Sequence, residues 1–128
     1  MLEGNLSCHM IYQDDDCIAI LDRYPIDDGH SLIITKKPYE KLTDMETDEV
    51  AKLFSKIPKI ANAIIKATNA DAFSIAQNNG KAAKQIIPHV HVHIIPRYNM
   101  KGTIWTKRKI SKESELTELA QKIKKYLE

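Results

Sequence analysis

Three histidines alternate with apolar residues in one short run of the chain, His89-Val90-His91-Val92-His93-Ile94-Ile95. Successive side chains of a β-strand point to opposite faces, so the run predicts a row of imidazoles on one face and an apolar row on the other. A neutral imidazole can attack phosphorus through one ring nitrogen while an acceptor holds the proton on the other. We expect His91 to be this nucleophile, because His89 and His93 flank it and can donate hydrogen bonds to phosphate oxygens.

Two other interpretations of the histidine run remain open. The imidazoles could be polar side chains on a half-exposed strand, although Val, Thr or Lys would be commoner there. They could also bind a metal, but a rise of about 3.3 Å per residue separates His89 and His93 by roughly 13 Å, too far for one ion. The sequence therefore predicts neither a metal nor a cofactor. A two-histidine metal site would need one further ligand, from His30, Cys8, Cys17, His9 or a distant acid.

The histidines lie in a segment without acidic residues. The chain has 17 acidic residues and a net charge of +2, yet residues 72–112 contain no Asp or Glu. The basic residues of that segment are Lys81, Lys84, Arg97, Lys101, Lys107, Arg108, Lys109 and Lys112. Such a segment attracts anions, although it could also be a solvated basic face. Nucleic acid is an unlikely partner, because basic and aromatic residues do not interleave as a stacking surface requires.

Length and composition predict one domain spanning residues 1–128. A chain of 128 residues with 43% hydrophobic content can bury one core without disulfides or metals. The first twenty residues have no secretory pattern, and no apolar stretch is long enough to cross a bilayer. Cys8 and Cys17 are not expected to face each other across a hairpin. We therefore expect a cytoplasmic protein that does not contact membranes.

Five segments with strand composition and two with helical periodicity indicate the elements that hold the histidines. The expected strands are residues 7–13, 17–22, 31–35, 73–77 and 89–95. A long helix is expected to begin at a capping box of Thr43 and Glu46 and to kink or break near Ile57, ahead of Pro58. Ser111 is expected to cap a C-terminal helix. This order predicts an α+β fold with a mainly antiparallel five-stranded sheet, a long helix and a C-terminal helix.

At these residues the chain resembles the histidine triad (HIT) family, whose signature is three histidines alternating with apolar residues. A second similar segment begins at Leu21-Asp22 and continues through Gly29-His30 to Lys36-Lys37. A third comprises Asn78-Asn79-Gly80 and Gln85. The likeness runs from about Glu3 to Arg97 in family order and spacing, which makes it far more specific than the triad alone.

The resemblance implies a pocket for a nucleoside monophosphate and hydrolysis at the α-phosphorus through a nucleotidyl-histidine. His91 resembles the nucleophile, and His30, His89 and His93 resemble its supporting histidines. Asn78 and Gln85 resemble polar residues near the phosphate. The family is also typically a homodimer with joined sheets.

Asp22 resembles the acid that holds the ribose. Two carboxylate oxygens can accept hydrogen bonds from vicinal hydroxyls, although a turn residue after a strand explains Asp22 equally well.

Two departures from the family pattern bear on the substrate. Ile86 stands where the family commonly has a Ser or Thr that assists the leaving group, and Lys84 stands where a glycine is common. The first hypothesis is an enzyme acting on purine nucleoside monophosphate derivatives, such as AMP phosphoramidates or acyl adenylates. The second is a dinucleoside polyphosphate hydrolase, in which Lys84 and Arg97 would hold the second phosphate group. The third is an AMP-binding sensor or scaffold with little turnover, which the loss of the hydroxyl at Ile86 favours.

Overall fold

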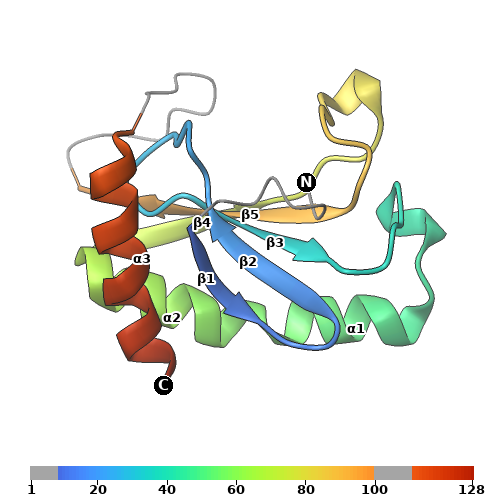
Figure 1. The fold of residues 1–128 in the computed structure, drawn as a ribbon. Coiled ribbons are helices and arrows are strands. Elements are labelled where there is room, and N and C mark those ends of the chain that lie inside the picture. The colour runs from blue at the N-terminus through green and yellow to red at the C-terminus, as the bar shows by residue number, and fades with distance from the viewer. Residues whose placement is uncertain (1–8, 100–110) are drawn as a thin grey trace.

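The computed structural model describes residues 9–99 and 111–128, which form one antiparallel sheet with helices on one face (Figure 1). The strand order is β1-β2-β3-β5-β4, and every neighbouring pair is antiparallel. The strands are β1 (Met10–Gln13), β2 (Cys17–Leu21), β3 (Ser31–Thr35), β4 (Ala72–Ala76) and β5 (His91–Arg97). The expected α+β class is confirmed. Ser7 and Cys8, expected in the first strand, lie outside the described residues.

In the view of Figure 1, the two α-helices between β3 and β4 lie below the sheet, the C-terminal helix crosses at its left, and the short helical turn between β4 and β5 lies above it at the right. They are η1 (Leu42–Asp44), α1 (Thr47–Ser55), α2 (Ile57–Thr68), η2 (Lys81–Ala83) and α3 (Glu113–Leu127). Pro58 lies in the first turn of α2, and the helix is interrupted at Lys56, between α1 and α2. The expected break near Ile57 is therefore confirmed. No helix in the described part of the chain is long and apolar enough to cross a membrane.

Both expected helix caps were wrong. Thr43 lies inside η1, where the Asp44 carboxylate accepts a hydrogen bond from the backbone N–H of Lys41 at 3.0 Å. This bond caps the start of η1, the chain becomes extended at Met45, and α1 begins only at Thr47. The N-cap of α3 is Lys112, so Ser111 lies two residues before the start of the helix, and its N–H donates to the Arg23 carbonyl at 3.3 Å. It therefore ties the helix start to the loop after β2.

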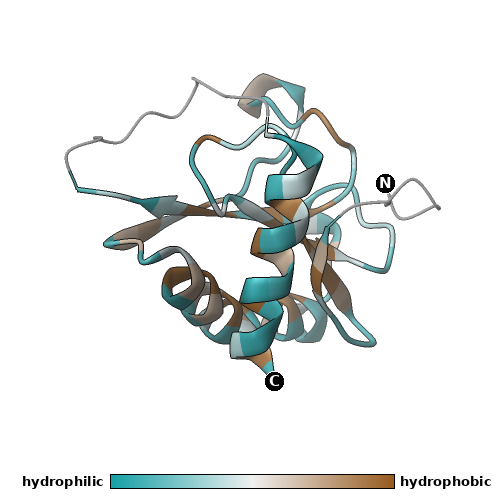
Figure 2. Ribbon diagram, turned by 60° about the vertical axis from the view of Figure 1, so that its left-hand side comes forward, coloured by the Kyte–Doolittle hydropathy of each residue, from teal (hydrophilic) through white to brown (hydrophobic). Residues whose placement is uncertain are grey.

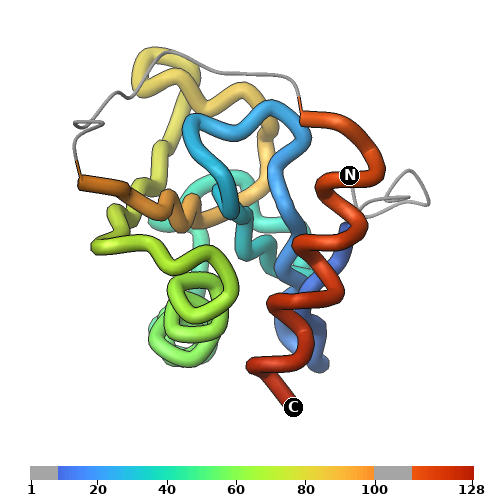
Figure 3. The backbone as a smooth tube through the Cα atoms, turned by 90° about the vertical axis from the view of Figure 1, so that its left-hand side faces the viewer, coloured from blue at the N-terminus to red at the C-terminus, as the bar shows by residue number. Residues whose placement is uncertain are grey.

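The core lies between the sheet and the helices. Alternation along β5 turns Val92 and Ile94 toward α2 and α3, and both are fully buried. The strands are largely brown in the hydropathy colouring, whereas α3 alternates between brown and teal, as an amphipathic helix does (Figure 2). Figure 3 shows α2 nearly end-on with α3 crossing beside it. A smaller buried cluster on the other face of the sheet comprises Ile18, Ile20, Leu32 and Ile34.

Strand β5 begins two residues later than expected, so His89 precedes it. Pro88 has no backbone N–H to donate, and the N–H of His89 donates to the Ile87 carbonyl at 2.8 Å in a tight turn. The ladder with β3 therefore starts at His91, paired with Ile34. Two of the three histidines alternate on the strand, and the third enters from a turn.

The β1–β2 hairpin is fixed to the helices through Asp14. Its carboxylate accepts hydrogen bonds from the Tyr12 hydroxyl at 2.7 Å, from the backbone N–H groups of Asp16 and Cys17, and from the Lys56 ammonium. Burial alone would raise the pKa of Asp14, but these four donors together hold it well below its usual range. Burial also raises the pKa of the free Cys17 thiol to about 12, so this thiol stays protonated.

Replacing Asp14 by Asn should lower the free energy of unfolding by about 1–3 kcal/mol at pH 7, because a charged acceptor is lost from a partly buried network. The folded pKa lies below the unfolded pKa, so this stabilisation is fully present above the unfolded pKa and is lost as the pH falls through the folded pKa. Urea denaturation should therefore show the difference from wild type shrinking below about pH 4. Asp15→Asn, at the exposed neighbouring position, is the control and should change stability little. A difference that persists unchanged at acid pH would contradict this account.

Candidate active site

The pairing of β3 with β5 places the strand histidines on the face away from the helices. Leu32 is paired with His93 and Ile34 with His91, and paired residues of antiparallel strands share a face. His30 immediately precedes β3 and is fully buried. Gly29, just before it, has φ +91°, and an added Cβ would lie 2.8 Å from Thr68 Cγ2. The loop thus passes close to α2 and delivers His30 beside His93.

The main chain sets the tautomer of His91. Its Nδ1 lies 2.7 Å from the carbonyl oxygen of His89. A carbonyl only accepts, so Nδ1 carries the proton and the neutral ring has its lone pair on Nε2. With 8% of its surface exposed, His91 is held in one orientation. The arrangement is that of an imidazole prepared to act as a nucleophile.

A chain of hydrogen bonds fixes the other two rings. The backbone N–H of Ile26 donates to His30 Nδ1 at 2.9 Å, so the His30 proton is on Nε2. That nitrogen lies 2.9 Å from His93 Nδ1, which must accept. The proton of His93 is therefore on Nε2. The His93 and His91 ring centroids are 5.1 Å apart, close enough for both rings to reach one phosphate.

His89 takes a different place from the one expected. Its Nε2 donates to the carbonyl of Thr35 at 2.6 Å, so the ring is fixed against the end of β3. His91 lies beside the imidazole of His93, and its Nδ1–H donates a hydrogen bond to the main-chain carbonyl of His89. The turn before β5 causes this difference, because it takes His89 out of the strand alternation.

Asp22 lies next to this pair of buried histidines. Its Oδ2 is 3.7 Å from His30 Nε2, and its Oδ1 accepts a hydrogen bond from the Tyr24 N–H at 2.8 Å. Asp22 therefore is a turn residue, and it also lies beside His30. Its contact with a ribose stays a prediction.

Asp22, His30 and His93 are the described residues that come closest to a metal-ligand set, with ligand atoms within 4.8 Å of one another. A histidine that binds a metal normally donates its other ring N–H to an acceptor. His30 instead accepts the Ile26 N–H on Nδ1, so coordination through Nε2 would require an imidazolate. The donor set fits a proton between His30 and His93 better than it fits a cation.

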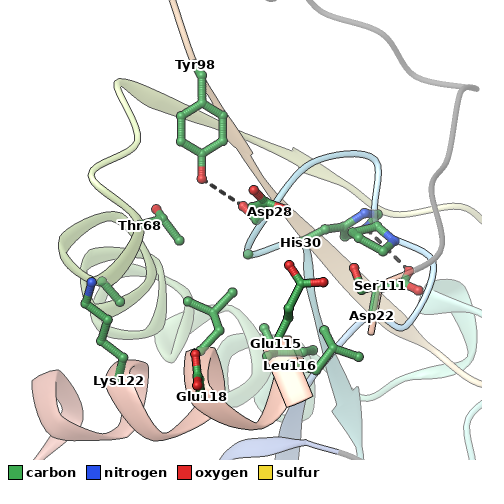
Figure 4. A pocket seen from close by; sticks show the side chains of 15 residues that line it. Asp22, Asp28, His30, Thr68, Tyr98, Ser111, Glu115, Leu116, Glu118 and Lys122 are labelled. Carbon is green, nitrogen blue, oxygen red and sulfur yellow. Dashed lines mark hydrogen bonds and ion pairs between the residues drawn. The ribbon is translucent and has the colours of Figure 1, made fainter. Parts of the chain in front are cut away.

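A pocket borders Asp22 and His30 and lies against α2 and α3 (Figure 4). The described residues that line it do not include His91. Its charged lining comprises the carboxylates Asp22, Asp28, Glu115 and Glu118 and the ammonium of Lys122. This acidic balance disfavours phosphate, which is better placed on the histidine face of the sheet.

The loop between β4 and β5 borders the site at the end where β5 begins. Gln85 is buried, and its side-chain amide accepts from the Gly80 N–H and donates to the Glu40 carbonyl, both at 2.6 Å. The Asn79 side chain accepts from the Leu42 N–H at 2.7 Å. Gln85 thus holds the loop against the segment after β3.

Two basic residues that the sequence associated with a second phosphate lie far apart. Lys84 is exposed in the loop and has φ 65°, a rare value for a residue other than glycine. Arg97 is 7% exposed at the opposite end of β5, where its Nε donates to Ser74 Oγ at 3.1 Å. The expectation that Arg97 faces the second phosphate group with Lys84 was wrong. Three functional partners were missed: the Ile26 N–H and the carbonyls of Thr35 and His89. Main-chain groups carry no side-chain signal in a sequence.

Comparison with known proteins finds relatives that cover nearly the whole chain. The chain is 39% identical over 132 residues to an adenylylsulfatase from Arabidopsis thaliana, covering 99% of this chain and 66% of that protein, slightly under two thirds of its length. It is 30% identical to an adenosine 5'-monophosphoramidase from Schizosaccharomyces pombe, covering 96% and 91% of the two chains. A histidine triad nucleotide-binding protein from Sulfolobus tokodaii superposes with a TM-score of 0.86 at 31% identity, covering 95% and 85%.

The HIT domain profile matches residues 3–100, which include Asp22, His30 and the whole histidine run. That range also contains all five strands. Because this match covers most of the chain, the chain belongs to the HIT domain family.

Proposed function

We propose that this protein is a nucleotide hydrolase or transferase acting at the α-phosphorus of purine nucleoside monophosphate derivatives, such as AMP phosphoramidates and acyl adenylates. The observation that carries the proposal is the 2.7 Å contact between His91 Nδ1 and the His89 carbonyl, which leaves the lone pair on Nε2. The adenylylsulfatase and monophosphoramidase relatives support the substrate class. We place the protein in the cytoplasm, a compartment compatible with the free Cys17 thiol.

In the proposed reaction, the Nε2 lone pair of His91 forms a bond to the α-phosphorus, and the bond from phosphorus to the leaving group breaks. The electron pair of that bond departs with the leaving group. An amine leaving group takes up a proton from solvent as this bond breaks. Water then attacks the phosphorus of the nucleotidyl-histidine, the electron pair of the P–N bond returns to Nε2, the proton of the water is released to solvent, and AMP leaves with His91 restored. The His93 Nε2–H supports both steps by donating to an oxygen of the phosphorus, where negative charge increases.

The remaining site residues have positioning or binding roles in this proposal. Asp22 and His30 lie beside His93 at one end of the histidine row, so the ribose is proposed to bind there. Asn78 and Gln85 belong to the loop at the other end, and Gln85 acts by holding that loop in place. Lys84 is, with Lys81, one of two exposed lysines of the loop, and Lys84 is proposed to contact the group attached to the α-phosphate. It is also the feature that favours a dinucleoside polyphosphate as the alternative substrate.

His91→Asn should reduce turnover by several orders of magnitude and leave AMP affinity within a modest factor, because the polar shape remains and the attacking nitrogen is lost. Rapid acid-free quench of the wild type should trap an AMP adduct that is stable to base and labile to acid. Peptide mapping should place it on His91.

Matched variants separate the histidines. His89→Asn and His93→Asn should be only partly impaired, since they support the reaction without forming the bond to phosphorus. An adduct on His30, His89 or His93, or normal turnover by His91→Asn, would disprove the mechanism. Tight AMP binding with negligible turnover of the wild type would instead support a sensor.

Turnover should not require a metal. The reason is the Ile26 N–H, which occupies Nδ1 of His30 and keeps the proton on the nitrogen that a cation would need. Dialysis against a chelator followed by assay with an AMP phosphoramidate should leave kcat/KM unchanged. Loss of turnover that added zinc restores would refute this prediction.

We further propose a homodimer that forms through strand β4. It is an edge of the sheet, and Phe73 and Ile75 on it are 43% and 45% exposed. The other edge, β1, carries a register irregularity between Met10 and Tyr12, which disfavours pairing with a further strand. The regular apolar edge is therefore the one suited to a second copy.

Light scattering should give twice the 14.6 kDa chain mass for the wild type and a monomer for Ile75→Lys, because a charge at the edge opposes strand pairing. Tyr126→Lys, at an exposed aromatic position on α3, is the control and should remain dimeric. A wild-type monomer over a wide concentration range would count against the dimer.

A further inference from the structure

The histidine row has two chemically different ends. Asp22 and His30 adjoin His93 at one end, with the contacts of 3.7 Å and 2.9 Å that link the three side chains. At the other end, β5 begins at His91, directly after the loop of residues 77–90. This loop rises above the sheet on the side away from the helices, which is also the histidine side (Figure 1). A substrate with its ribose at Asp22 and its phosphorus at His91 therefore has its leaving group beside the loop. This placement rests on the proposed function.

Lys84 and Ile86 are exposed on either side of the buried Gln85. Gln85 is clamped between Gly80 and Glu40, and its neighbours Lys84 and Ile86 are exposed, Ile86 by 90%. Lys84 adopts a left-handed conformation at φ 65° and ψ 34°, which costs a non-glycine residue of the order of 1 kcal/mol. A lysine at a position suited to glycine points to a functional role for its side chain.

The loop offers positive charge and apolar surface but no hydroxyl, phenol or carboxyl group to protonate a leaving atom. Residues 80–90 contain no Ser, Thr, Tyr, Asp or Glu. The Nε2–H of His89 in this loop is already donated to the Thr35 carbonyl. An amine must be protonated before it can leave phosphorus, whereas sulfate, a carboxylate or a phosphate leaves as a stable anion.

We infer that Lys84 and Ile86 make this site selective for adenylyl mixed anhydrides, whose leaving group departs as an anion, over AMP phosphoramidates. His91 Nε2 forms the bond to phosphorus while the bond from phosphorus to the anhydride oxygen breaks. The oxygen keeps the electron pair and departs without a proton. The Lys84 ammonium neutralises the charge that develops on the departing group.

The test compares kcat/KM for adenylyl sulfate with that for an AMP phosphoramidate of a simple amine, two substrates with the same nucleoside. The wild type should prefer the anhydride by more than about tenfold. Ile86→Ser, which adds a hydroxyl, should raise kcat/KM for the phosphoramidate and narrow this ratio by about threefold or more, whereas Ile86→Val should not. Lys84→Ala should lower kcat/KM for adenylyl sulfate by about three- to tenfold and should lower kcat/KM for the phosphoramidate less.

Lys66→Ala removes an exposed positive charge from α2, on the other side of the sheet, and is the matched control. If the wild type cleaves both substrates without preferring the anhydride, or if Lys84→Ala behaves like Lys66→Ala, the inference is wrong while the proposed function stands. If neither substrate releases AMP, the proposed function fails first and the inference fails with it.

Discussion

The pairing of β3 with β5 is the constraint on which the site depends. Its register sets Leu32 opposite His93 and Ile34 opposite His91, with Val92 facing the helices. A slip of one residue would turn the imidazoles into the apolar core and Val92 toward the substrate. The burial of Val92 and Ile94 against α2 and α3 opposes that slip, so the packing of the core and the orientation of the histidines stabilise the same register.

Main-chain groups then determine the protonation of each ring. The His89 and Thr35 carbonyls and the Ile26 N–H are held by the turn, the strand end and the loop that contain them. Because these groups cannot exchange donor for acceptor roles, each neutral imidazole has one tautomer. The lone pair on His91 Nε2 and, through His30, the proton on His93 Nε2 thus depend on the backbone fold and are set before any ligand binds.

Much of this architecture could be predicted from local sequence, and the exceptions share a cause. The bounds of Ser31–Thr35 and the break at Pro58 follow from β-branched composition and from a missing N–H, both properties of single residues. The caps at Thr43 and Ser111 failed because other backbone partners were available nearby. The turn that takes His89 out of the strand is local to Pro88 and the Ile87 carbonyl, whereas the Thr35 carbonyl that then fixes the His89 ring is distant in sequence. The proximity of Asp22, His30 and His93 followed from the family likeness, whereas the hydrogen bonds among them required the fold.

The apolar edge strand β4 bears on both the solubility of the protein and its assembly into a dimer. Strand β4 reads Ala-Phe-Ser-Ile-Ala, with no lysine, no proline and no irregular register to deter a further strand. An edge of this kind pairs with whatever extended chain is available, including partly unfolded copies of the same protein. Covering it with a second folded copy would therefore guard against aggregation, and the chain would be most vulnerable to aggregation when newly synthesised and still without a partner.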